Sequence, residues 1–215
     1  MIMGALLKIL FHLLIVRPLT LVVIGLNVRG KSNLPKKGPA ILAANHNSHL
    51  DTLILQSLFP LCMQKSIRPV AAADYFMKNR LLAWFSTQVM GILPIQRKLS
   101  ISGGDPLSGC IEALEKGEIL IIYPEGSRGE AEKISDFKNG IAHLAKKFPE
   151  SPVFPIFLHG CGKALPKGEA IFVPFFVDCV VGEPRYWCGN KNEFTEELRS
   201  DIDALSEQCD LKAWE

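Results

Sequence analysis

Short apolar runs of strand length alternate with helix-like stretches along most of this 215-residue chain. The runs that predict strands cover 39–45, 68–73, 91–96, 118–123, 153–158 and 170–181. The stretches that predict helices cover 51–59, 81–90, 107–116, 136–148 and 193–208. This alternation is typical of α/β domains. We therefore predict an α/β fold with a mixed, largely parallel central sheet flanked by helices.

The first 28 residues are an apolar segment that contains no acid and only Lys8 and Arg17 as full charges. Its two uncharged stretches, 9–16 and 18–28, are shorter than the roughly 20 residues that cross a bilayer. Pro18 lies at their junction, where proline disfavours a continuous helix. The charges are not gathered at the start and no small-residue cleavage site follows, which argues against a secretory signal peptide.

Three interpretations of this apolar segment remain open. It forms two short helices that dip into one leaflet, one tilted span that tolerates Arg17, or a soluble helical hairpin packed on the domain. We favour the first, so residues 1–28 are predicted to form a membrane-associated helical hairpin and residues 29–215 one domain. The basic residues that follow are those expected at a negatively charged cytoplasmic leaflet, namely Arg29, Lys31, Lys36 and Lys37. We therefore expect the cytoplasmic face of the inner or cell membrane as the location.

The charge of the chain is divided unevenly although the net charge is only +2. Residues 1–100 carry 12 Lys and Arg against two acids, which gives +10, whereas residues 101–215 carry 12 against 20, which gives −8. A basic half predicts contact with an anionic surface, either membrane or nucleic acid. The apolar N-terminus and a mean hydropathy of +0.18 favour the membrane, and no nucleic-acid partner is expected.

The six cysteines occur singly, without a CxxC pair. This spacing fits neither a zinc module nor a disulfide framework, so we expect reduced thiols.

The strand at 39–45 runs directly into a segment that holds His46 and Asp51. If a turn separates the two residues, the Asp51 carboxylate can hold the imidazole in one tautomer, and the other ring nitrogen can accept a hydroxyl proton. An alternative is purely structural, because Ser48 and Asp51 have the spacing of a helix-capping box. A metal site built from His46, His49 and Asp51 lacks the usual ligand spacing and a fourth ligand, so no metal is expected.

A second cluster, Glu125-Gly126-Ser127-Arg128, follows the clearest strand. Ligands of open α/β sheets bind at the carboxyl ends of strands, and glycines with a hydroxyl and a guanidinium suit an anion such as phosphate. An ordinary turn with a surface ion pair is the alternative. Ser127 lacks the GxSxG context of a hydrolase nucleophile, and no Walker or GxGxxG motif occurs in the chain.

Four ordered blocks resemble those of the glycerolipid acyltransferase family, whose best-known members are the 1-acylglycerol-3-phosphate acyltransferases. They are Asn45-His46-x4-Asp51, Gly91 to Arg97, Pro124 to Arg128, and Val153-Phe154-Pro155. The resemblance extends over about residues 20–190. Pro94 replaces a usual aromatic residue and Ser127 a usual threonine, and the first of these departures puts the identity of the acceptor in question.

The resemblance implies a membrane-associated O-acyltransferase of phospholipid biosynthesis with an acyltransferase domain over 29–215. It would move a fatty acyl group from acyl-CoA or acyl carrier protein to the hydroxyl of a lysophospholipid, with no cofactor. His46 would act as general base supported by Asp51, and Arg97 and Arg128 would hold the acceptor phosphate within a loop shaped by Glu125, Gly126 and Ser127. A non-catalytic lipid-binding protein of the same fold, or a lysophospholipid hydrolase or transacylase, is the alternative.

Overall fold

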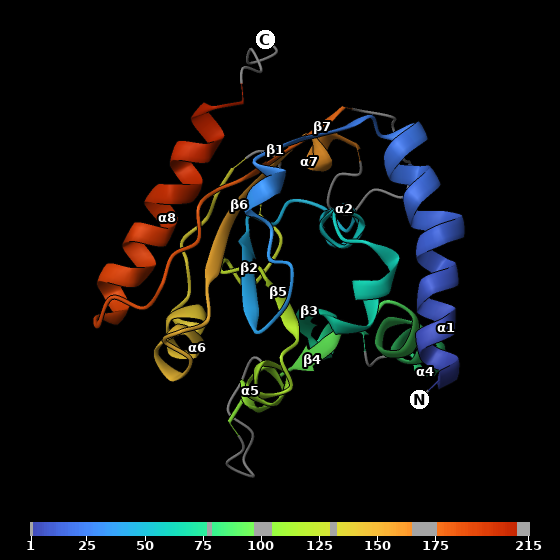
Figure 1. Cartoon of the computed structure of the whole chain (residues 1–215), viewed down its shortest axis with the longest axis horizontal. Helices are drawn as coiled ribbons and strands as arrows, with labels where there is room; N and C mark the ends of the chain where they lie inside the picture. Colours follow the sequence, from blue (N-terminus) through green and yellow to red (C-terminus); the bar gives the residue numbers. More distant parts are fainter. Residues whose placement is uncertain (1, 77–78, 97–104, 130–132, 165–175, 210–215) are drawn as a thin grey trace.

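Five neighbouring parallel strands form the centre of the sheet, and two reversed strands extend one side of it (Figure 1). The computed structural model describes residues 2–76, 79–96, 105–129, 133–164 and 176–209. The strand order is β1-β7-β6-β2-β5-β3-β4, and only the β6–β7 pair is antiparallel. The predicted mixed, largely parallel α/β sheet is confirmed. The strands are β1 (Leu26–Arg29), β2 (Ala40–Ala44), β3 (Ile67–Ala72), β4 (Leu93–Ile95), β5 (Ile119–Ile122), β6 (Val153–His159) and β7 (Val177–Val181).

Helices cover both faces of the sheet (Figure 1). One face packs against α2 (Leu50–Ser57) and α7 (Cys161–Ala164), and the other packs against α5 (Ser108–Glu115), α6 (Gly140–Lys147) and α8 (Lys191–Glu207). Every residue of the central strand β2 is buried, and its side chains alternate between the two faces. Such a continuous apolar run is what a strand covered on both sides requires.

The remaining described helices are short and lie mostly between β2 and β4 or at the N-terminus. They are η3 (Lys31–Asn33), η4 (Leu61–Ser66), α3 (Ala73–Phe76), α4 (Arg80–Trp84) and η5 (Phe85–Val89), together with the N-terminal α1 (Ile2–Phe11), η1 (His12–Val16) and η2 (Leu19–Val23).

The N-terminal segment forms one continuous helix from Ile2 to Val23, not the predicted hairpin (Figure 1). Pro18 is accommodated inside it with ordinary helical angles. Around the proline the backbone bonds have π spacing, from residue i to residue i−5, as in the bond from Arg17 N–H to the His12 carbonyl. This wider turn gives the proline ring the room that an α-helical turn denies it. An apolar N-terminal helix is therefore present, but Arg17-Pro18 does not divide it.

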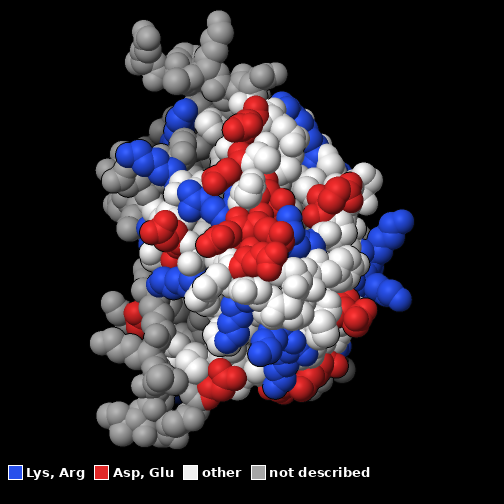
Figure 2. All heavy atoms as spheres, turned by 90° about the vertical axis from the view of Figure 1, so that its left-hand side faces the viewer, with Lys and Arg blue, Asp and Glu red and all other residues white. Residues whose placement is uncertain are grey.

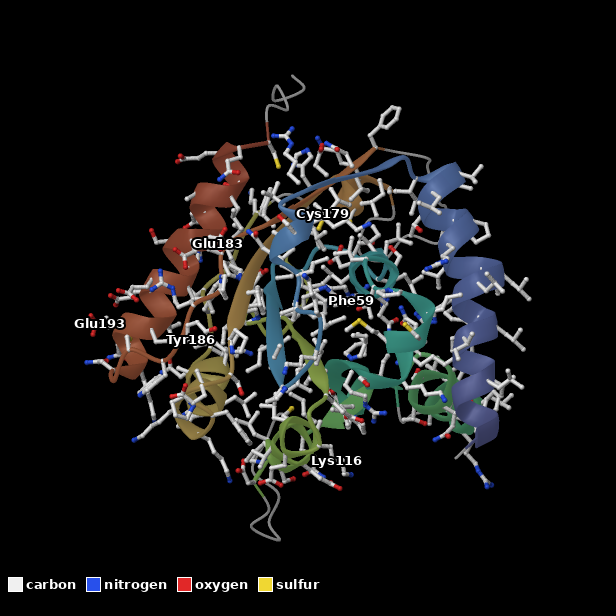
Figure 3. All side chains as sticks on the ribbon, viewed as in Figure 1. Phe59, Lys116, Cys179, Glu183, Tyr186 and Glu193 are labelled. Carbon is white, nitrogen blue, oxygen red and sulfur yellow. The ribbon has the colours of Figure 1, made fainter. Side chains whose placement is uncertain are left out.

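The inner face of this helix buries three polar side chains, and its outer face is apolar. Residues four apart along the inner face, Lys8, His12, Val16 and Thr20, are all at most 4% exposed. The outer face exposes Leu6, Leu10, Leu13, Leu14, Ile15, Leu21, Val22 and Val23. A surface helix of a water-soluble domain has the opposite arrangement. The outer side chains project away from the domain in Figure 3, whereas the labelled Phe59 lies in the interior.

The strand β1 was not predicted, and it takes residues 26–28 from the segment assigned to the membrane. Leu26 to Arg29 pair in parallel register with Val177 to Val180 of β7. The strand has only four residues and is separated from the apolar helix only by Ile24 and Gly25, so its sequence carries no separate periodic signal. The domain sheet therefore begins at Leu26. The predicted strand region 170–181 is represented by β7, and residues 170–175 lie outside the described residues.

Acidic side chains gather on the face of the molecule that α8 covers (Figure 2). This helix lies on the side of the sheet opposite the N-terminal helix (Figure 1). The acidic C-terminal half of the sequence thus contributes its last helix to the side of the fold away from the apolar N-terminal helix.

Candidate active site

The carboxyl edge of the three adjacent parallel strands β6, β2 and β5 brings the predicted site residues together. His46 lies two residues after β2, and the loop that begins at Tyr123 follows β5 directly. Because β2 pairs with both β5 and β6, the segments that leave these strands are neighbours. This edge is where ligands of open α/β sheets bind.

Asn45 fixes the point at which the chain leaves β2. Its side-chain amide donates to the Leu158 carbonyl at 2.8 Å, and the Leu158 N–H donates to its carbonyl oxygen at 2.7 Å. The amide thus makes the same pair of bonds to β6 that a backbone residue would make in a sheet. His46 consequently starts from a rigidly held position.

His46 and Asp51 form a direct pair. Nδ1 of His46 lies 2.9 Å from Oδ2 of Asp51, whose side chain is 1% exposed against 18% for His46. An ionised carboxylate only accepts hydrogen bonds, so the contact assigns the ring proton to Nδ1 and leaves Nε2 as an acceptor. The turn that the sequence required between these residues is present, since Asp51 lies in the first turn of α2.

Asp51 also organises the start of α2. The same Oδ2 atom accepts the backbone N–H groups of Asn47 at 2.8 Å and Ser48 at 2.9 Å. The bond from Ser48 has the three-residue spacing of a capping box, although the N-cap residue of α2 is His49. The structural interpretation and the contact with the imidazole are therefore compatible, because one oxygen makes both sets of bonds.

Glu125 joins the loop after β5 to the His46 segment. The side chain is 3% exposed, and its Oε1 accepts the backbone N–H of His46 at 2.8 Å. Its Oε2 accepts the N–H of Ser135 at 3.0 Å and the Ser135 hydroxyl. A second tie runs from Gly129 N–H to the His46 carbonyl at 3.0 Å. Glu125 therefore shapes the loop from within.

The other residues predicted in this loop lie nearer its surface. Gly126 has a left-handed φ of +73°, and a Cβ there would lie 2.8 Å from Nζ of Lys138. Ser127 is exposed and Arg128 is half-buried. Partial desolvation lowers the pKa of His49, and the positive charge of Arg128 lowers it further. The positive charge of Arg128 is therefore close enough to affect His49, which lies between His46 and Asp51 in the chain. Arg97 lies outside the described residues.

Sequence reasoning missed three contributions. The Lys138 side chain adds a cation beside Gly126, the Glu125 carboxylate bonds to the backbone of His46, and the Tyr123 ring stacks on His46. The contacts of Glu125 and Tyr123 join segments far apart in the chain, so only the strand order could have revealed them, whereas Lys138 belongs to the same connection between β5 and α6 as Gly126. In the part of the chain that the structure describes, no three His, Cys, Asp or Glu side chains gather to hold a metal ion.

The fold and the site together define an α/β protein that holds a carboxylate-supported histidine at the carboxyl edge of its sheet. The chain belongs to the acyltransferase family, because the sequence model of that family, described as Acyltransferase, matches residues 25–159. The family that the four sequence blocks indicated is thereby confirmed.

Individual relatives agree with this family. The chain is 33% identical over 189 residues to the chloroplastic 1-acyl-sn-glycerol-3-phosphate acyltransferase LPAT1 of Arabidopsis thaliana, covering 86% of this chain and 49% of the relative. It is 28% identical to the 1-acyl-sn-glycerol-3-phosphate acyltransferase of Pseudomonas aeruginosa, covering 86% and 70%. A third relative, 26% identical over 60% of this chain and 42% of its own length, is the lyso-ornithine lipid O-acyltransferase of Rhizobium meliloti.

A solved structure shares the fold. The crystal structure of the acyltransferase PlsC from Thermotoga maritima superposes with a TM-score of 0.75 at 22% identity, covering 97% of this chain and 81% of that one. The chain spans only about half of the length of the two plant relatives that it matches.

Proposed function

We propose that this protein transfers a fatty acyl group from an acyl thioester to the free hydroxyl of a lysophospholipid, with 1-acylglycerol-3-phosphate as the first acceptor to test. The observation that carries the proposal is the His46–Asp51 pair at the carboxyl edge of the sheet, beside a loop that carries Arg128. The names of the Arabidopsis and Pseudomonas relatives support this acceptor. The Rhizobium relative acts by its name on a lyso-ornithine lipid, so the head group needs direct testing.

The proposed reaction needs one general base and no covalent enzyme intermediate. Nε2 of His46 takes the proton of the acceptor hydroxyl while the hydroxyl oxygen bonds to the thioester carbonyl carbon. The carbon–sulfur bond then breaks, and the leaving thiolate takes the proton back from the imidazolium. Asp51 keeps Nδ1 protonated and offsets the positive charge on the ring.

The loop after β5 is the proposed site for the acceptor phosphate. Arg128 offers a planar fork for two hydrogen bonds, and Lys138 offers a second positive charge beside Gly126. Glu125 is already engaged by His46 and Ser135, so its proposed contribution is to hold this loop. Arg97 keeps the acceptor-binding role that the family resemblance implies. Acyl-CoA and acyl carrier protein are both proposed donors, and no cofactor or metal enters the reaction.

The N-terminal helix is the proposed membrane contact. Among the described residues, the stretch Leu6–Val23 is the one helix long and apolar enough to cross a bilayer by length and composition. The helix, however, packs along its length on the domain: α1 contacts η4 and η5, η1 contacts α2, and Lys8 bonds to the Ile67 carbonyl. We therefore propose that it lies in the plane of one leaflet, with its outer face in lipid.

A second apolar element extends the proposed membrane face. Leu81 and Trp84 of α4 are 78% and 50% exposed. Figure 1 shows α4 beside the N-terminal end of α1, and the following turn η5 contacts α1. Tryptophan is enriched at membrane interfaces, which suits this position. The cytoplasmic side remains the proposed location, on the basis of the basic residues that follow the helix.

The proposed function is tested by mass analysis of the products formed from lysolipids and acyl donors. The purified full-length protein is incubated in lipid vesicles with lysophosphatidic acid or lyso-ornithine lipid, and with acyl-CoA or acyl carrier protein thioester. The proposal predicts a diacyl product with one of these acceptors. Release of free fatty acid without a diacyl product would identify a hydrolase, and binding of the lysolipid with no turnover would identify a lipid-binding protein.

A further inference from the structure

The aromatic ring of Tyr123 lies flat against the imidazole of His46. The two ring centroids are 3.9 Å apart and the planes differ by 13°. The stack follows from the sheet, since Ala43 of β2 pairs with Ile122, the last residue of β5, and Tyr123 follows directly. Strand pairing thus places this ring beside the segment that carries the candidate base.

The Tyr123 ring is itself held in place. Its hydroxyl lies 2.9 Å from Oγ1 of Thr52, the residue that follows Asp51 on α2. Burial, and to a smaller extent the Asp51 charge, raise the pKa of the Tyr123 hydroxyl well above its usual value, so the group stays neutral. One turn of α2 therefore anchors both the carboxylate that meets the edge of the imidazole and the ring that covers its face.

We infer that Tyr123 is a positioning residue for the proposed acyl transfer: its ring fixes the orientation of His46 and favours the imidazolium that forms when His46 takes a proton. The face of an aromatic ring carries negative electrostatic potential and attracts a cation lying over it. A flat contact also prevents the imidazole from rotating away from Asp51. The inference rests on the proposed function for its catalytic part, whereas the effect on His46 itself is independent of any substrate.

The alternative is that Tyr123 only fills space, since its ring also packs against the apolar core on the α2 side of the sheet. Two substitutions separate these roles. Tyr123→Phe keeps the ring and removes the bond to Thr52, whereas Tyr123→Leu keeps an apolar side chain and removes the ring. A space-filling role predicts similar behaviour of the two variants at His46.

The experiment follows the ring resonances of His46 by NMR against pH in the full-length protein, together with the kcat and KM of acyl transfer. We expect Tyr123→Leu to move the titration midpoint of His46 to lower pH and to lower kcat by about 2- to 30-fold, the range that cation–π energies imply. Tyr123→Phe should leave the midpoint in place and kcat within about threefold of the wild type. His143 on α6 provides an internal reference that should not move in either variant.

Two outcomes would overturn the inference. One is an unchanged His46 midpoint in a folded Tyr123→Leu protein, and the other is an equal shift in the Phe and Leu variants. Thermal unfolding of both variants establishes that they fold. If the wild type forms no acylated product at all, the proposed function fails, but the NMR comparison still decides whether the ring stack acts on His46.

Discussion

Oδ2 of Asp51 lies 2.9 Å from Nδ1 of His46, and the same atom accepts the backbone N–H groups of Asn47 and Ser48. Three donors from one short segment thus converge on one buried oxygen. This arrangement ties the tautomer of the imidazole to the conformation of the turn that carries it. A change at Asp51 should therefore affect catalysis far more than it affects folding, provided that an oxygen acceptor remains.

The first prediction is that Asp51→Asn lowers kcat by on the order of 10²-fold or more, because the amide removes the negative charge that offsets the imidazolium. The amide oxygen can still accept the backbone N–H groups, so the melting temperature should change little. Asp105→Asn is the matched control, since Asp105 accepts the N–H of Leu107 at the start of α5, away from the site. Equal activity of the two Asn variants would contradict the role assigned to Asp51.

The second prediction concerns the loop after β5. Arg128→Lys should raise the KM for a phosphate-bearing acceptor more than the KM for the acyl thioester, because lysine lacks the planar fork. Arg97→Lys should do the same on the basis of the family resemblance. Steady-state kinetics with both substrates varied measure the effect. A selective rise in the thioester KM would instead assign these arginines to the donor.

Arg185→Lys is the contrasting control for that experiment. The Arg185 guanidinium bonds to both carboxylate oxygens of Asp201 at 2.7 and 2.9 Å, and also to Glu197. These partners lie on α8, so the change should lower the melting temperature and leave the ratio of the two KM values unchanged. If Arg128→Lys behaves in the same way, its role is structural.

The third prediction concerns the outer face of the N-terminal helix. Leu14 and Val22 are 66% and 81% exposed, and burying such a side chain in lipid contributes about 1.5–3 kcal/mol. Changing either residue to Glu should therefore weaken vesicle binding by roughly tenfold or more. Tyr186→Glu is the control, because Tyr186 is 51% exposed on the α8 side of the molecule (Figure 3). Vesicle flotation in which all three variants bind as the wild type does would contradict the proposed membrane face.

The fourth prediction concerns Lys8, which is buried between that helix and the domain. Burial, and next the charge of Arg68, lower the pKa of Lys8 to about 7, while Glu118 opposes the shift. His12, one turn away, also has a lowered pKa, chiefly through burial. Above pH 7 the unfolded chain keeps a proton on Lys8 that the folded protein has lost, so the free energy of unfolding should rise with pH.

Lys8→Met tests this assignment. Between about pH 7 and 8.5 the wild-type melting temperature should rise relative to that of the variant, which has no ammonium to deprotonate. Burial raises the pKa of the Cys110 and Cys179 thiols to about 12, which lowers the stability of both proteins at higher pH, so the difference between them reports on Lys8. If the melting temperatures of wild type and variant instead change in parallel with pH, the pKa of Lys8 does not change on folding.

The sequence predicted the strands of the sheet well because they are short apolar runs bounded by proline, glycine or polar residues. Two features of the N-terminus could not be read in this way. Pro18 indicates a break only if the helix keeps α spacing, and the π spacing on either side of it removes the conflict. The edge strand β1 depends on pairing with β7, which lies about 150 residues away.

In the candidate site, too, the local features could be predicted from the sequence and the contacts between distant segments could not. The His46–Asp51 pair follows from local geometry, since a strand, a turn and a helix start within six residues fix both side chains. The supports of His46 come from β5, β6 and the loops beyond them: Tyr123 on its face, Glu125 on its backbone and Leu158 beside Asn45. No periodicity in the sequence reveals which of these strands are neighbours. The acceptor roles of Arg97 and Arg128 remain predictions.

The central claim is that His46 is the base of a hydroxyl acylation, and one comparison tests it most directly. Initial rates of diacyl product formation from lysophosphatidic acid and acyl-CoA are measured for the wild type, His46→Ala and His143→Ala, with a melting temperature for each. We expect His46→Ala to lose about 10²- to 10⁴-fold in rate while it remains folded. His143→Ala should retain the wild-type rate. A folded His46→Ala protein that forms diacyl product at the wild-type rate would contradict the claim.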